Sequence, residues 1–368
     1  MPNKNILVLS LTSFAIDTTF ASWWMILPLY LERLGAKVAD IGISFALVYL
    51  CWAISQLPGG LLSDKFGRKK LIIISTSTFI PFYAVMPFLK NWISATAAIA
   101  LSFFFAGLQN PSFSSIIAES SEKIEVPKAF GFYNFLMNLG WAVGPLIGAF
   151  IIPVYGFDAM FTAGALISSF CLLARFYLSE PSEAGEKLKF SLREGLPILM
   201  SILIFQLANG IISPLVPIYA ERLMKMTLSE VELMFFLAQL LTSISCLFAG
   251  SFVVKAGWMK SLSISFFLSG IFSLTWTFSL PYASFILFSL YYIFLFGFAE
   301  VSFGTAISNM TFRGNRATVF GTATVISGLS NSAGSYIGGN IWEISQPRTP
   351  FFLASILMMI SPLFIKRR

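Results

Sequence analysis

Residues 59–70 read GGLLSDKFGRKK, and a weaker copy of this stretch, GSFVVKAGWMK, occupies residues 250–260. Four positions return at an offset of 190: Gly60 as Gly250, Lys65 as Lys255, Gly67 as Gly257 and Lys70 as Lys260. Each copy forms a short basic loop that closes an apolar run of membrane-spanning length. The pattern predicts a duplicated membrane protein with a charged hairpin at the same place in each half.

The composition places the whole chain in a membrane. Apolar residues make up 57% of it and charged residues 11%, which is outside the range of soluble globular proteins. A helix needs about 20 apolar residues to cross a bilayer core. About twelve such runs are found, approximately at 5–31, 38–62, 71–89, 93–118, 129–152, 157–178, 195–220, 229–254, 262–280, 282–310, 317–341 and 349–365.

The basic residues predict the orientation. With both termini in the cytoplasm, seventeen Lys or Arg fall in cytoplasmic segments and six in external ones, and Arg175, at the end of its span, is not counted. This asymmetry follows the positive-inside rule. The net charge of +7 is therefore a topology signal and does not indicate nucleic-acid binding. The short loops favour a multi-pass protein of a prokaryotic cell membrane.

Several classes of chemistry lack their usual residues. The chain has no histidine, and its three cysteines (Cys51, Cys171 and Cys246) all fall inside predicted helices. The sequence therefore predicts no metal site, cofactor or disulfide. No nucleophile elbow appears either, so an enzyme is not expected.

The two halves align over almost their whole length. Beyond the hairpins, the same register pairs residues 28–34 with 217–223, Gly107 with Gly297, 130–131 with 320–321, Gly144 with Gly334 and Gly148 with Gly338. Six helices per half is an even number, so the halves are expected to be parallel repeats. The predicted fold is all-α, with a six-helix bundle at 1–178, a polar cytoplasmic linker at 179–194 and a second six-helix bundle at 195–368. Two such bundles can rock about a central site, which gives alternating access.

The hairpin resembles a signature of the major facilitator superfamily, G-x-L-x-D-x-x-G-R-K between helices 2 and 3. The resemblance implies a latch between the halves formed by Gly60, Asp64, Gly67 and Arg68. In it, Gly60 allows close helix approach, Asp64 faces the start of helix 11 near Thr318, and Arg68 pairs with Glu119 or Glu122. The copy has Val254 for Asp64 and Trp258 for Arg68, so the latch is expected on one side only. Alternatively, the stretch is a tight basic turn that fixes topology.

Helix 5 carries a second motif, Gly140-Trp-Ala-Val-Gly144-Pro145-Leu-Ile-Gly148-Ala149. It resembles the G-x-x-x-G-P-x-x-G-G pattern of proton-coupled antiporters in the superfamily, with Ala149 in place of the last glycine. Small residues at every fourth position also let helices pack backbone to backbone. An ordinary packing seam is therefore the alternative interpretation.

Two acids, Asp17 and Glu300, are expected deep in the membrane, where a charge is costly and usually functional. The resemblance implies that helices 1, 4, 7 and 10 line a central cavity, and both acids fall on these helices. Neither has an obvious cationic partner at its depth. A carboxyl in such a place can bind and release protons or anchor a cationic substrate. The alternative for Asp17 is a packing acid bonded to Ser13, Thr18 and Thr19.

The repeat adds polar candidates to the same cavity. Asp17 corresponds to Gln206 and Glu300 to Asn110, so each half offers one acid and one amide. Further polar contacts are predicted from Asn209, Asn134, Asn138 and Gln239. Phe103 stands where many related drug exporters carry an arginine, which weakens any analogy with the proton relay of those exporters. With no arginine expected at mid-depth, anionic substrates are disfavoured.

The preferred interpretation is a proton-coupled efflux transporter for small lipophilic or cationic molecules, acting as a monomer. Forty phenylalanines and the Trp23–Trp24 pair indicate an aromatic interior. The first alternative is an uptake symporter or facilitator for a neutral metabolite such as a sugar. The second, from another class, is a non-transporting membrane receptor or scaffold. Fold alone does not decide between them.

Overall fold

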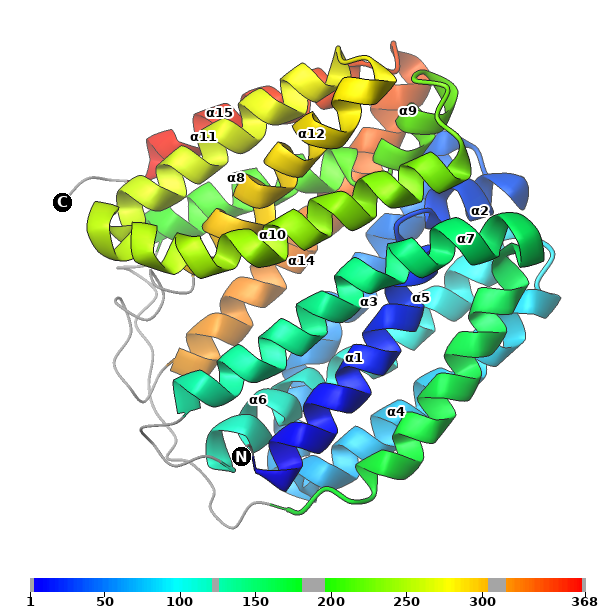
Figure 1. Cartoon of the computed structure of the whole chain (residues 1–368), viewed down its shortest axis with the longest axis vertical. Helices are drawn as coiled ribbons and strands as arrows, with labels where there is room; N and C mark the ends of the chain where they lie inside the picture. The colour runs from blue at the N-terminus through cyan, green and yellow to red at the C-terminus, as the bar shows by residue number, and fades with distance from the viewer. Residues whose placement is uncertain (1–2, 121–125, 181–195, 304–315, 366–368) are drawn as a thin grey trace. The chain divides into compact units, whose positions relative to one another are not determined.

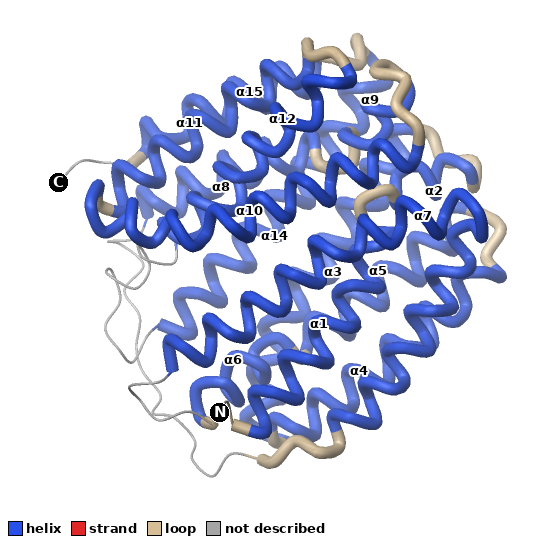
Figure 2. Tube along the Cα trace, in the orientation of Figure 1, coloured by secondary structure: helices blue, strands red, loops and turns tan. Residues whose placement is uncertain are grey.

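The computed structural model describes residues 3–120, 126–180, 196–303 and 316–365, which are mostly helical, are joined by short loops and contain no strand (Figure 2). They belong to two compact units, one of residues 1–35 and 47–185 and one of 36–46 and 186–368. The start of helix α3 groups with the second unit because Gly42 lies against Ser335 and Gly339 there. The predicted linker lies outside the described residues from 181 onward, and the boundaries 1–178 and 195–368 stay predictions.

The first unit is built around a long helical hairpin (Figure 1). Both arms of α7 (Val126–Arg175) pack against α1 (Lys4–Trp24), and Gly156, at φ +76°, turns the chain between the arms. This hairpin holds two of the predicted spans. The other helices of the unit are α2 (Leu27–Arg33), most of α3 (Val38–Phe66), α4 (Arg68–Val85), the 3₁₀ turn η1 (Met86–Phe88), α5 (Trp92–Leu108) and α6 (Asn110–Glu119).

The second unit has a similar series of helices. They are α8 (Leu196–Ile212), α9 (Val216–Arg222), α10 (Leu228–Ala256), α11 (Trp258–Thr277), α12 (Pro281–Tyr292), the π-helix η2 (Ile293–Phe298), α14 (Arg316–Ile344), α15 (Thr349–Ile360) and the 3₁₀ turn η3 (Ser361–Phe364). Helix α14 packs on α8, and α11 packs on α15 and α12. Across both units, eight helical segments of the described residues are long and apolar enough to span a membrane.

Several predicted spans consist of two helices with a proline just after the break. Pro28 follows the break between α1 and α2, and Pro217 follows the break between α8 and α9. Proline cannot donate the backbone hydrogen bond of a helix interior but fits the first turn of a new helix. The two breaks lie at matching positions of the two halves.

Contacts also repeat between the halves at an offset of 190. A Cβ on Gly107 would collide with Ser55 Oγ, and one on Gly297 would collide with Ser245 Oγ. Each serine donates to a carbonyl three residues earlier at 2.7 Å. The sequence repeat is therefore a repeat of helix packing.

The two hairpins share their backbone geometry. Gly67 and Gly257, at φ +93° and +82°, each separate two helices, a conformation that a residue with a Cβ rarely adopts. In the first hairpin the Glu180 carboxylate accepts hydrogen bonds from the backbone N–H groups of Arg68 and Lys69, at 2.5 and 2.9 Å. An acid at a helix N-terminus satisfies unpaired donors and interacts favourably with the helix dipole.

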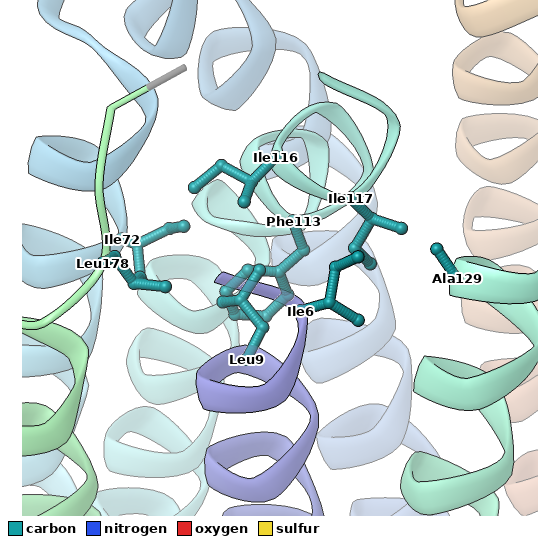
Figure 3. Close-up of a cluster of buried hydrophobic side chains, with 8 residues drawn as sticks. All are labelled: Ile6, Leu9, Ile72, Phe113, Ile116, Ile117, Ala129 and Leu178. Carbon is teal, nitrogen blue, oxygen red and sulfur yellow. The ribbon is translucent and has the colours of Figure 1, made fainter. Parts of the chain in front are cut away.

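A cluster of buried apolar side chains lies near the beginning of α1 in the first unit. Figure 3 shows Ile6 and Leu9 of α1 beside Phe113, Ile116 and Ile117 of α6, together with Ile72, Ala129 and Leu178. This cluster positions Phe113, whose ring faces a buried arginine described below.

Candidate functional site

Asp17 lies half-buried in α1, near the buried cation Arg175 of α7. The two side chains are close enough to interact electrostatically, and the charge of Asp17 also acts on Tyr83 and Tyr133. Asp17 thus has a cationic neighbour that was not identified from the sequence. Arg175, although it ends its span, is buried and only 1% exposed, while the expected absence of an arginine at mid-depth of the membrane stays a prediction.

Arg175 is held by three uncharged side chains, from α1, from α4 and from the turn between α5 and α6. Its guanidinium donates to Thr12 Oγ1 at 3.2 Å, Thr76 Oγ1 at 2.5 Å and Gln109 Oε1 at 2.9 Å. It also lies 5.0 Å from the centre of the Phe113 ring, a cation–π contact. None of these contacts, within the described part of the chain, comes from an acidic group, so none of them neutralises the positive charge of Arg175. Asp17 is therefore its counter-charge at longer range.

The hydroxyl groups next to Asp17 bond elsewhere. Thr18 and Thr19 donate to the carbonyls of Phe14 and Ile16, and Ser13 bonds the Tyr133 hydroxyl at 3.5 Å. Asp17 is therefore not the packing acid of the alternative interpretation, since these three hydroxyls do not bond it.

Aromatic rings cover the next turns of α1. Phe20 lies 5.2 Å from Phe103, 5.3 Å from Trp141 and 5.2 Å from Trp24, measured between ring centres. Trp24 in turn lies 4.7 Å from Phe103. Phe103 is thus part of an aromatic cluster one to two helical turns of α1 from Asp17.

An apolar pocket of about 390 Å³ lies between α1 and the two arms of α7. Its lining includes Phe14, Ala15, Thr18 and Thr19 of α1. At 3.6 residues per turn these positions point away from the side of α1 that carries Asp17 and Phe20. The pocket is therefore separate from the acidic site.

In the second unit the amides gather around Asn331 of α14, a residue that the sequence analysis did not select. Asn209 donates to Asn331 Oδ1 at 3.2 Å, and Asn331 donates to Gln206 Oε1 at 3.5 Å. Tyr291 of α12 donates to Asn209 Oδ1 at 3.3 Å. Two predicted residues, Gln206 and Asn209, are thus brought together by a third amide.

Three other predicted residues lie apart from these clusters. Glu300 follows η2, has an exposed side chain, and is near enough to Cys246 of α10 for its charge to act on that thiol. Asn110 is half-buried at the start of α6, next to the buried Gln109, and Asn134 of α7 is exposed. None of the three bonds Asp17, Gln206 or Asn209 in the described residues.

The glycine motifs act in helix packing within the first unit. A Cβ on Gly144 would lie 2.6 Å from both Ala21 Cβ and Thr18 O of α1, and one on Gly140 would lie 2.8 Å from Phe14 O. Gly148 is buried one turn further along, beyond Pro145. In the hairpin, a Cβ on Gly60 would meet nothing within 4 Å, while one on Gly59 would collide with the backbone of Leu108 in the same unit. The close approach of Gly60 to a helix of the other half stays a prediction.

The remaining latch residues are only partly described. The side chains of Asp64, Glu119 and Thr318 lie outside the described residues, as does Glu122. The contacts expected from Asp64, and those of Arg68 with Glu119 or Glu122, therefore stay predictions.

Arg175→Met is expected to destabilise the protein by about 3 kcal/mol, because it leaves Gln109 and Thr76 buried without their charged donor. Arg175→Lys is expected to cause a smaller loss of stability than Arg175→Met, since an ammonium keeps the charge but cannot reproduce the three hydrogen bonds of the guanidinium. Thermal unfolding in detergent measures the effect. Arg33→Met, at an exposed site, is the control, and equal melting temperatures for the Arg33 and Arg175 variants would contradict the role of Arg175.

A profile described as Major Facilitator Superfamily matches residues 9–335. The chain belongs to the Major Facilitator Superfamily. It therefore has the superfamily's twelve-helix fold, and it is a membrane transporter rather than an enzyme.

Known members of the Major Facilitator Superfamily agree with this assignment. An uncharacterized MFS-type transporter of Methanocaldococcus jannaschii is 26% identical over 99% of this chain and 94% of that protein. Quinolone resistance protein NorA of Staphylococcus aureus is 30% identical, over only 45% of this chain and 42% of NorA. The crystal structure of a D-xylose-proton symporter superimposes with a TM-score of 0.80 at 14% identity, covering 99% of this chain and 97% of that chain.

Proposed function

We propose that the protein exports small lipophilic or cationic compounds in exchange for protons, by alternating access. The observation that carries this proposal is Asp17 beside the aromatic cluster of Phe20, Trp24, Phe103 and Trp141. Aromatic faces attract organic cations, and a carboxylate supplies the counter-charge. The similarity to a quinolone resistance protein over part of the chain supports the same substrate class.

Proton coupling follows from competition at Asp17. A cation and a proton both neutralise the same carboxylate, so binding of one favours release of the other. The cation Arg175 makes the charged form of Asp17 less costly to bury. Glu300, in the second unit, is proposed as a second acid of this kind.

The wider architecture is part of the proposal. The basic hairpins support cytoplasmic termini and a cell-membrane location. Parallel six-helix halves are proposed to rock as bodies, with the hairpin of Gly60, Asp64, Gly67 and Arg68 as a one-sided latch. The motif around Pro145 is proposed to serve the antiport cycle, and the protein is proposed to act as a monomer.

A second candidate function is proton-coupled uptake of a neutral, hydroxylated solute. The amide cluster of Gln206, Asn209 and Asn331 favours it, because amides donate to and accept from hydroxyl groups. The structural likeness to a D-xylose-proton symporter supports it at the level of the fold.

Transport in proteoliposomes tests the two candidates. Vesicles acidic inside, with the membrane potential clamped by potassium and valinomycin, are expected to accumulate ethidium and to lose it when nigericin dissipates the pH gradient. Radiolabelled xylose in the opposite gradient tests the alternative. Gradient-driven xylose uptake without any ethidium response would overturn the efflux proposal.

A further inference from the structure

Glu232 is a fully buried acid that the sequence analysis did not select. It lies in the second turn of α10 and has an exposed fraction of 0%. Both carboxyl oxygens are buried and have no hydrogen-bond partner among the described residues. Such an acid is rare, since buried polar atoms are almost always paired.

A neighbouring acid of the same helix shows the contrast. Glu230 is exposed and closes a capping box with Thr227, accepting from its backbone N–H at 2.7 Å. The side chain of Glu232, two residues later, has no part in this cap. The Glu232 carboxyl is therefore not required to cap the N-terminus of α10.

The described elements packed against α10 provide no hydrogen-bond partner for the Glu232 carboxyl. These elements are α9, α11, α12 and η2. Their titratable groups, with those of α10 and its N-terminal approach, are Tyr219, Glu221, Arg222, Lys225, Glu230, Cys246, Lys255, Lys260, Tyr282, Tyr291 and Tyr292. None of these described groups forms a hydrogen bond with either carboxyl oxygen of Glu232.

We propose that Glu232 is a proton-binding site of the second unit, occupied while the start of α10 is buried and emptied when a conformational change admits water. An ionised carboxylate without a partner costs several kcal/mol in such a place. The carboxyl is therefore neutral here. Any state that hydrates it permits ionisation, so proton release accompanies that state and proton uptake accompanies its closure.

This inference does not depend on Asp17 or Glu300 carrying protons. It requires only that burial of one carboxyl differs between two conformations of the transporter. By linkage, removing protons then favours the hydrated conformation, by at most tenfold in population per pH unit for a single proton.

The test uses the full-length protein in lipid nanodiscs, without substrate or gradient. The infrared spectrum near neutral pH is expected to contain the carbonyl stretch of a protonated carboxyl without hydrogen bonds. Glu232→Gln is expected to remove this band, and Glu230→Gln, which preserves the capping pattern, to leave it unchanged.

Accessibility labelling measures the linked conformational change. In a chain with its three cysteines replaced by serine, the maleimide labelling rate of Leu233→Cys is expected to rise with pH by up to tenfold per unit. Glu232→Gln is expected to make this labelling rate independent of pH. Glu232→Asp keeps a carboxyl and is expected to keep the pH dependence of labelling. This second variant provides a result if Glu232→Gln does not fold. A band that survives Glu232→Gln, or an unaltered pH dependence of labelling, would overturn the proposal while leaving that of Asp17 intact.

Discussion

Asp17→Asn is expected to abolish substrate accumulation driven by a pH gradient. Exchange of one proton for one monovalent cation across two pH units supports accumulation of about 100-fold, since each pH unit corresponds to a factor of ten. Asparagine keeps the size of the side chain but cannot exchange a proton. The ethidium concentration inside the vesicles is therefore expected to fall to the outside value.

A matched set of variants distinguishes loss of proton coupling from loss of folded protein. Ethidium exchange at equal pH on both sides is expected to weaken in Asp17→Asn as well, because the amide also lacks the negative charge that binds the cation, while a normal melting temperature shows that the fold is intact. Asp158→Asn, at an exposed position of α7, serves as the control with normal accumulation. Glu300→Gln is measured alongside. Gradient-driven flux that is unchanged in both Asp17→Asn and Glu300→Gln would remove these acids as proton carriers.

Gly144→Leu is expected to prevent correct folding of the first unit. Even the Cβ of alanine would approach Ala21 Cβ and Thr18 O to 2.6 Å, closer than side chains tolerate. Overpacking a tight core by a few methyl groups costs about 1–3 kcal/mol, and here a backbone oxygen blocks relaxation. The yield of monodisperse protein on size-exclusion chromatography is expected to drop to near zero.

The hairpin glycine provides the control for this result. Gly60→Leu adds the same atoms to a helical glycine in the same unit, where a Cβ meets nothing within 4 Å. It is expected to give normal yield and melting temperature. Loss of folded protein in Gly60→Leu, but not in Gly144→Leu, would contradict the tight packing of α1 against α7 at Gly144.

The family and the helical fold could be predicted from the sequence because they depend on local patterns. Apolar runs, the hairpin GGLLSDKFGRKK and the constant register of the repeat are all visible along the chain. The breaks beside Pro28 and Pro217 were not predicted, although proline marks them, because each run is apolar on both sides of its break.

Tertiary packing decides what the sequence leaves open. Arg175 lies at the end of its span, where a basic residue often contributes only to the orientation of the protein in the membrane. In the structure it is surrounded by Thr12, Thr76 and Gln109, which are distant in sequence. Glu232 looks like a second interfacial acid beside Glu230. No local pattern shows which of the two neighbouring acids is buried, because that depends on the helices packed against α10.

The paired contacts of Ser55 with Gly107 and Ser245 with Gly297 show what the two halves have in common. One arrangement of packed helices serves both halves. The acids have no such counterpart, since Asp17 is matched by Gln206 and Glu300 by Asn110. The halves thus share their packing and differ in where they carry charge, so a substitution at the serine–glycine contact has the same structural meaning in either half, whereas a substitution at an acid does not.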